Sequence, residues 1–150
     1  CALERAGVTL AVGTDGCASN NDLDMFSETR TAALLAKAVA QDAAALDAFS
    51  ALRAATLGGA KAIGFDDRIG SIEPGKEADL VCVDLSALET QPLHHVVSQL
   101  IYATGRQQVS DVWIAGRPKL QQRVLVEIDI DGVIANARQW RERIAGIRLS

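Results

Sequence analysis

The sequence is poor in histidine, cysteine and aromatic residues, and it contains no long apolar run. Its 150 residues include two histidines, three cysteines without a CxxC spacing, and 4% aromatic residues. No apolar stretch approaches the ~20 residues that a membrane-spanning helix needs, and no signal-peptide pattern opens the chain. A net charge of −4 provides no basic surface for nucleic acid or an anionic membrane. These absences predict a reduced, cytoplasmic protein with neither nucleic-acid nor membrane partners.

The two histidines also limit the metal chemistry of the chain. His94 and His95 are adjacent, so their side chains point to opposite faces of a strand or about 100° apart on a helix. The sequence contains no HxH, no HExxH and no Cys/His cluster. We therefore expect that the chain cannot build a three- or four-ligand zinc site by itself.

An apolar stretch that ends on a carboxylate is the most informative feature present. Residues 8–12, "VTLAV", have the pattern of a short buried strand, and Gly13-Thr14-Asp15-Gly16 follows directly. Such a strand suits a parallel sheet covered on both faces, but the chain holds only one such strand–helix unit. We expect its neighbours in sequence beyond these 150 residues or in another chain. The opening "CALERAG", without methionine, likewise predicts a piece of a longer protein.

Periodicity and capping signals predict helices in the rest of the first part. A helix is expected over about 22–40, with Asn20, Asn21 and Asp22 as N-cap candidates. A second helix is expected after Asp42 and is interrupted at Gly58-Gly59.

The character of the chain changes at residue 65. Glu73-Pro74-Gly75-Lys76 predicts a type II turn, and a strand over 80–85 places Cys82 in the core. A hairpin with its turn at Gly116-Arg117 and an amphipathic C-terminal helix follow. The predicted units are residues 1–64, 65–130 and 131–150.

Asp15 is the strongest candidate for chemistry. A carboxylate just past the carboxyl end of a parallel strand is placed where α/β barrels build active sites, although aspartate also commonly caps a turn. Gly16 and Ser19 leave room for a ligand and equally suit a tight loop. Cys17 could act as a nucleophile, but no base lies nearby in sequence, so a small loop residue is the simpler interpretation.

Five motifs occur in a characteristic order: "GTD", "SNNDLDMF", "ATLGGAKAIG", "IGSIEPGKEADL" and "VSDVWIAGR". Together they resemble the C-terminal third of the amidohydrolase superfamily over roughly residues 1–125. The branch most similar contains cytosine, adenosine-type and S-adenosylhomocysteine/methylthioadenosine deaminases and s-triazine chlorohydrolases. The resemblance implies an α/β fold. Residues 1–64 would be the last strand and closing helices of a (β/α)₈ metal-dependent hydrolase barrel, 65–130 part of a small β-sandwich, and 131–150 a C-terminal helix.

The resemblance also implies roles for the residues of the first loop. Asp15 would be a ligand of a divalent metal, usually zinc, and the catalytic group that accepts a proton from water and returns one to the leaving amine. Gly16 and Ser19 would line the substrate pocket. The remaining ligands lie upstream in the family, so the 150-residue chain alone is expected to be inactive. We expect a homo-oligomer or association with an upstream part.

The leading hypothesis is a portion of a metal-dependent aminohydrolase that deaminates or dechlorinates a nitrogen heterocycle. An adenosine derivative, a guanine-like base and an s-triazine are the candidate substrates. One alternative is a truncated, non-catalytic assembly or scaffold module. Another is a cyclic amide or imidazolone hydrolase of the same superfamily, but the "SNNDLDMF" stretch favours the deaminase and chlorohydrolase branch.

Overall fold

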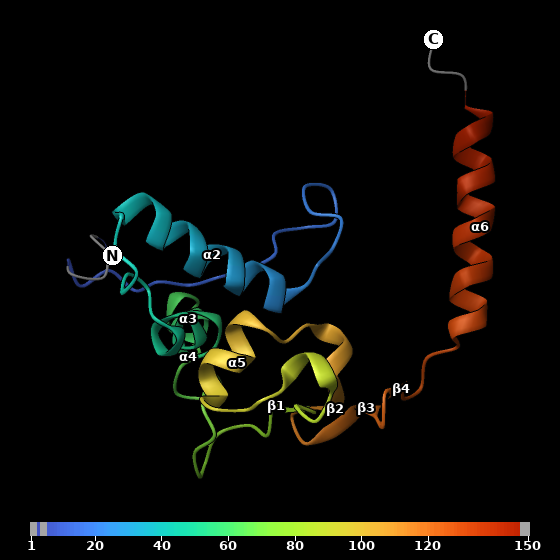
Figure 1. The fold of residues 1–150 in the computed structure, drawn as a ribbon. Coiled ribbons are helices and arrows are strands. Elements are labelled where there is room, and N and C mark those ends of the chain that lie inside the picture. Colours follow the sequence, from blue (N-terminus) through green and yellow to red (C-terminus); the bar gives the residue numbers. More distant parts are fainter. Residues whose placement is uncertain (1–2, 4–5, 148–150) are drawn as a thin grey trace.

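The computed structural model describes residue 3 and residues 6–147 of the chain. Helices α2 to α5 form a helical layer beside a four-stranded antiparallel sheet, and helix α6 stands apart from both (Figure 1). This mixed helix and strand content fits the predicted α/β class. The elements are α2 Met25–Ala40, α3 Ala48–Ala55, α4 Leu57–Ala62, β1 Leu80–Val83, η1 Leu88–Thr90, α5 Val96–Tyr102, η2 Arg106–Gln108, β2 Val109–Ile114, β3 Arg117–Gln121, β4 Val124–Leu125 and α6 Ile130–Gly146.

Aspartates cap the N-termini of helices α2 and α3 of the layer. The Asp24 carboxylate accepts a hydrogen bond from the Phe26 backbone N–H at 2.9 Å, so Asp24 is the N-cap of α2 rather than one of the three candidates before it. Asp47 caps α3 in the same way. The predicted helix start at Asp42 is wrong, because the Asp42 carboxylate accepts from the Ala44 N–H within a turn.

Gly58 and Gly59 lie inside α4 and do not interrupt a helix. The break between α3 and α4 falls at Thr56, whose φ of −126° and ψ of −97° are not helical. A Cβ on Gly58 would lie 2.3 Å from the Leu10 carbonyl oxygen. The missing side chain therefore allows residues 8–12 to run against the start of α4.

Small side chains let the helices of the layer approach closely. Ala33 of α2 and Ala51 of α3 are fully buried, and Ile101 of α5 packs in the same cluster. Arg30 fastens α2 to α5, because its Nε donates to the Ile101 carbonyl at 3.1 Å and its guanidinium also donates to the Thr104 carbonyl. The three helices thus form one packed unit on which the preceding loop is mounted.

The sheet is an antiparallel meander in the order β1-β2-β3-β4. Ala115 and Gly116 connect β2 to β3 with φ of 49° and 73°, the left-handed pair that a two-residue hairpin turn requires. This turn lies one residue before the predicted position. The turn at residues 73–76 is confirmed, since Gly75 has φ 93° and the Lys76 N–H donates to the Glu73 carbonyl at 3.2 Å.

Cys82 is exposed, so the prediction that it lies in the core is wrong. It belongs to β1, an edge strand with a single neighbouring strand. Val81, whose side chain points to the opposite face, is 57% exposed. The described residues therefore bury neither of these two side chains of β1.

Residues 8–12 are extended, but they pair with no strand among the described residues. The Val12 N–H donates to the Ala54 carbonyl at 3.1 Å, and Leu10 packs against the helical core. Val8 is 49% exposed. The strand predicted here is not formed, because the described chain offers no second parallel strand whose backbone could pair with it.

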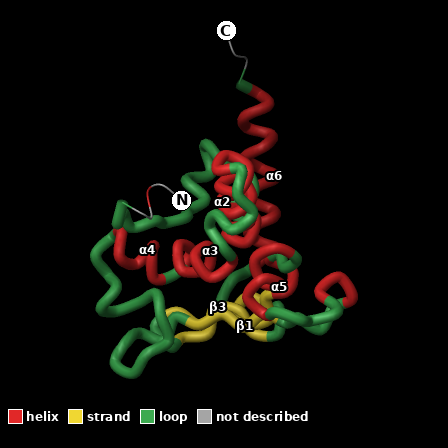
Figure 2. Tube along the Cα trace, turned by 60° about the vertical axis from the view of Figure 1, so that its left-hand side comes forward, coloured by secondary structure: helices red, strands yellow, loops and turns green. Residues whose placement is uncertain are grey.

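Helix α6 follows β4 and projects away from the other elements (Figures 1 and 2). None of its residues is buried. Neither α6 nor any other described helix combines the length and apolar character needed to cross a membrane.

Candidate active site

The loop of residues 13–24 joins the extended segment 8–12 to α2 and carries Asp15. The Asp15 side chain is exposed, and its backbone has a left-handed φ of 59°. Its Oδ1 accepts a hydrogen bond from the Gly16 N–H at 2.7 Å, and its Oδ2 accepts one from the Ser19 hydroxyl at 2.8 Å. The structure therefore brings together the three predicted site residues, Asp15, Gly16 and Ser19.

These two hydrogen bonds favour the charged form of Asp15. The Ser19 hydroxyl is the larger cause and the Gly16 N–H the smaller, and together they hold the pKa of the Asp15 carboxyl below its ordinary value. A carboxylate oxygen can accept more than one hydrogen bond or ligand contact. Asp15 thus keeps acceptor capacity for a cation or a proton while its orientation is fixed by its own loop.

The second half of the loop is held by residues from other elements. Asn20 donates to the Glu28 carboxylate of α2 at 2.7 Å. Arg106 donates a hydrogen bond to the backbone carbonyl of Asp22 at 2.8 Å and forms an ion pair with the Asp22 carboxylate, also at 2.8 Å. Sequence reasoning missed Arg106, because 84 residues separate it from Asp22 and no local pattern links them.

A complete metal site is not present in the part of the chain that the structure describes. No group of three or more histidine, cysteine, aspartate or glutamate residues gathers there. His95 has a structural position, since its Nδ1 accepts a hydrogen bond from the Ser98 N–H and caps α5. Asp15 offers carboxylate oxygens that suit zinc, but a zinc ion needs three or four ligands. The described residues therefore supply one candidate ligand of such a site.

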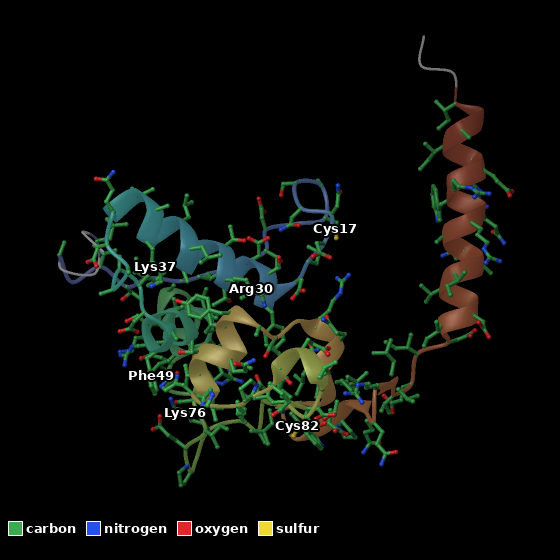
Figure 3. The ribbon with its side chains drawn as sticks, viewed as in Figure 1. Cys17, Arg30, Lys37, Phe49, Lys76 and Cys82 are labelled. Carbon is green, nitrogen blue, oxygen red and sulfur yellow. The ribbon has the colours of Figure 1, made fainter. Side chains whose placement is uncertain are left out.

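Cys17 is an exposed, free thiol in the same loop and lies far from Cys82 in Figure 3.

A separate apolar cleft of about 620 Å³ opens between the helical layer and β1, and it includes no residue of the Asp15 loop. It is lined by Met25, Phe26, Thr29, Leu52, Ala55, Thr56, Ile69, Gly70, Ser71, Ile72, Asp79, Leu80, Val81, Val83, Leu100 and Ile101.

Comparison with known proteins identifies the class to which this fold and loop belong. A model of the amidohydrolase family matches residues 2–119, which include the Asp15 loop, the helical layer and most of the sheet. The chain therefore belongs to the amidohydrolase family, as the order of its motifs predicted.

Three individual proteins show which members of the family this chain is similar to. The chain is 51% identical over 147 residues to a 5-methylthioadenosine/S-adenosylhomocysteine deaminase of Teredinibacter turnerae, covering 98% of this chain and 33% of the relative. It is 76% identical to a zinc-bound adenosine deaminase from Xanthomonas campestris, with a TM-score of 0.95 over 98% of this chain and 34% of that chain. It also resembles the zinc complex of the atrazine chlorohydrolase TrzN of Arthrobacter aurescens, with 29% identity and a TM-score of 0.83 over 91% of this chain and 30% of that chain. The chain spans about a third of the length of these relatives.

Proposed function

We propose that this chain is the C-terminal portion of a zinc-dependent aminohydrolase that releases ammonia from an adenosine-type substrate. The observation that carries the proposal is the position of Asp15. It follows an apolar extended segment, its two oxygens are ordered by Gly16 and Ser19, and its chain closely resembles deaminases. In the complete enzyme, residues 8–12 would be the last strand of a (β/α)₈ barrel and Asp15 would lie at its catalytic end.

The absence of a strand partner for residues 8–12 among the described residues supports this placement. The backbone of this segment bonds to the helical layer through Val12, and Val8 remains half exposed. A neighbouring parallel strand would pair with those backbone groups of residues 8–12 that have no partner among the described residues, and it would cover their apolar side chains. Residues 65–130 would form part of a small β-sandwich, whose other part would cover the exposed β1.

Asp15 would then serve as one zinc ligand and as the proton carrier of the reaction. Zinc supplies Lewis acidity that makes water nucleophilic near neutral pH. The charged Asp15 carboxylate would accept the proton lost by water at one oxygen and return it to the departing amine. The Ser19 hydroxyl would hold the other oxygen, so that the carboxylate keeps its orientation while the proton moves.

Identity to the relatives favours an adenosine-type substrate. The relative at 51% identity is named as a deaminase of 5-methylthioadenosine and S-adenosylhomocysteine, and the one at 76% as an adenosine deaminase. Hydrolytic dechlorination of an s-triazine is the second candidate, and it rests on the 29% identity to the atrazine chlorohydrolase. A lower identity over the same segment makes it the weaker proposal.

The test is a product assay on the complete protein that carries this chain. Ammonia release would be measured with 5′-methylthioadenosine, S-adenosylhomocysteine, adenosine, guanine and cytosine, and chloride release with a chlorotriazine. We expect ammonia from one or more adenosine derivatives. Chloride release alone would replace the proposal with the second candidate. Zinc-loaded protein that acts on none of these compounds would overturn both, leaving a scaffold module or a cyclic amide hydrolase.

A further inference from the structure

Asp15 lies at the start of a turn whose residues are linked by a continuous series of hydrogen bonds. The Asp15 carboxylate accepts from the Gly16 N–H and the Ser19 hydroxyl. The Gly16 carbonyl accepts from the backbone N–H groups of Ser19 and Asn20, both at 3.0 Å. The Asn20 side-chain oxygen accepts from the Asp22 N–H, also at 3.0 Å. The orientation of Asp15 is therefore linked to the position of Asp22 at the other end of the turn.

Two residues outside the loop hold the end of the turn that lies away from Asp15. On α2, the half-buried Glu28 carboxylate accepts a hydrogen bond from the Asn20 amide at 2.7 Å. On η2, Arg106 Nη1 donates to the Asp22 carbonyl and forms an ion pair with the Asp22 carboxylate, both at 2.8 Å. Glu28 is near the loop in sequence, whereas Arg106 reaches it through the fold of the chain. Arg106 therefore connects the loop to a distant element.

The turn that carries Arg106 is fixed by its own buried side chains. Thr104 and Gln108, on either side of Arg106, are buried, and both side chains are hydrogen-bonded. The Gln108 side-chain oxygen accepts from the Gly105 N–H at 2.8 Å, and its nitrogen donates to Glu89 at 2.7 Å. Arg106 thus extends from a backbone that is held in place, which is what a residue needs in order to position another group.

Arg30 joins the same turn to α2, so the two elements that hold the loop are also held to each other. Its guanidinium donates to the Thr104 carbonyl, and its Nε donates to the Ile101 carbonyl at 3.1 Å (Figure 3). The loop, α2 and η2 form a closed ring of contacts within the described chain. The zinc-bound adenosine deaminase from Xanthomonas campestris has the same overall backbone arrangement, with a TM-score of 0.95 over 98% of this chain and 34% of that chain.

We propose that Arg106 is a positioning residue for the deamination reaction, a role that rests on the proposed function. By holding Asp22, Arg106 keeps the Asp15 carboxylate in the orientation in which it accepts and returns a proton. A small displacement of a catalytic group can cost on the order of 100-fold in rate, even when its cause lies far from the chemistry. The side chains of Arg106 and Asp22 are 64% and 53% exposed, and an ion pair so exposed contributes little to stability. We therefore expect its loss to affect turnover more than unfolding.

Two variants of the complete, zinc-loaded protein separate the contacts of Arg106 from the packing of its side chain. Arg106→Met keeps an unbranched apolar side chain without donors, whereas Arg106→Lys keeps a cation that donates. Both contacts come from one nitrogen, Nη1, so a single ammonium group can reproduce them. For the best adenosine derivative, we expect Arg106→Met to lower kcat about tenfold with KM changed less than about threefold, since Asp15 acts in the chemical step. Arg106→Lys should retain kcat to within about threefold.

Two further variants are controls for these measurements. Arg68→Met removes a similarly exposed ion pair, with Glu77, that lies outside the ring of contacts around the loop. It should leave kcat and KM unchanged. Asp22→Asn leaves the backbone carbonyl and a side-chain oxygen as acceptors for Arg106, so it should not reproduce the loss seen with Arg106→Met.

Hydrogen–deuterium exchange of the same variants reports on the loop without substrate or turnover. The N–H groups of Ser19, Asn20 and Asp22 are bonded within the turn. Peptides covering residues 13–24 should therefore exchange about threefold faster or more in Arg106→Met, and at the original rate in Arg106→Lys and Arg68→Met.

The combined result separates this role from the proposed function. An active original protein in which Arg106→Met leaves kcat or loop exchange unchanged, or in which Arg106→Lys loses as much as Arg106→Met, would overturn the positioning role alone. An original protein that releases no ammonia from any adenosine derivative would overturn the proposed function, and the positioning role with it.

Discussion

The helical layer and the segment of residues 8–24 differ in how many of their hydrogen-bonding and packing partners the described chain supplies. Helices α2, α3 and α5 have aspartate or histidine N-caps and share a buried cluster around Ala33, Ala51 and Ile101. Within this segment, residues 8–12 pair with no strand among the described residues, and Leu10 packs against that cluster. Local and helix–helix contacts can form within one short chain, whereas a parallel strand depends on neighbours brought from far along the sequence.

Residues 8–12 lie against the helical layer at Gly58. We expect a substitution there to have the largest effect on stability. In Gly58→Ala the new Cβ would meet the carbonyl oxygens of Leu10 and Arg53 at 2.3 and 2.9 Å. We expect a destabilisation of about 1–3 kcal/mol and faster hydrogen–deuterium exchange in peptides covering residues 8–12.

The adjacent glycine is the matched control. A Cβ on Gly59 would come no closer than 3.8 Å to the Ala54 carbonyl oxygen. Because alanine is favoured over glycine within a helix, Gly59→Ala should be neutral or stabilise by up to about 1 kcal/mol. Equal destabilisation by both substitutions would show that segment 8–12 does not depend on close approach at Gly58.

Removing a cap should disturb the layer and leave the segment in place. Asp47→Ala removes the acceptor of the hydrogen bond from the Ser50 N–H and should cost about 1 kcal/mol. Asp42→Ala, which alters a turn, should cost less. Thermal unfolding of both variants measures the difference, and a larger loss at Asp42 would mean that the helix start is assigned incorrectly.

The same cap should respond to acid, with a smaller effect. The hydrogen bond from the Ser50 backbone lowers the pKa of Asp47, so its contribution is complete above the unfolded-state pKa of about 3.9. That contribution is lost as the pH falls through the lower folded-state pKa. Asp47→Asn keeps an acceptor that does not titrate, and should reduce the acid-induced fall in melting temperature. An identical acid profile would exclude Asp47 as a contributor.

Much of the antiparallel and helical structure could be predicted from local sequence. Pro74-Gly75 determines a turn through the backbone preferences of two adjacent residues, and the structure has that turn. The first residue of a helix is harder to predict. Several aspartates and asparagines precede α2, and only the side chain that accepts a hydrogen bond from a free N–H of the first turn acts as the cap. The exposure of Cys82 depends on which elements cover β1, and no pattern within the strand encodes that.

Only those residues of the candidate site that lie in one loop could be predicted from the sequence. Asp15, Gly16 and Ser19 are near in sequence, so their juxtaposition follows from a short turn. Arg106 reaches Asp22 because the chain folds back over a long distance, which spacing does not reveal. The further ligands that zinc needs do not gather among the described residues.

Replacement of Asp15 tests the central claim most directly. In the complete, zinc-loaded protein, Asp15→Asn keeps the size of the side chain but removes the charge that would bind the metal and accept a proton. We predict that ammonia release from the best adenosine derivative falls by a factor on the order of 10²–10⁴ or more, with an unchanged circular dichroism spectrum. Asp22→Asn, in the same loop, should stay within a few-fold of the original enzyme. Activity of Asp15→Asn equal to that of Asp22→Asn would contradict the catalytic role of Asp15.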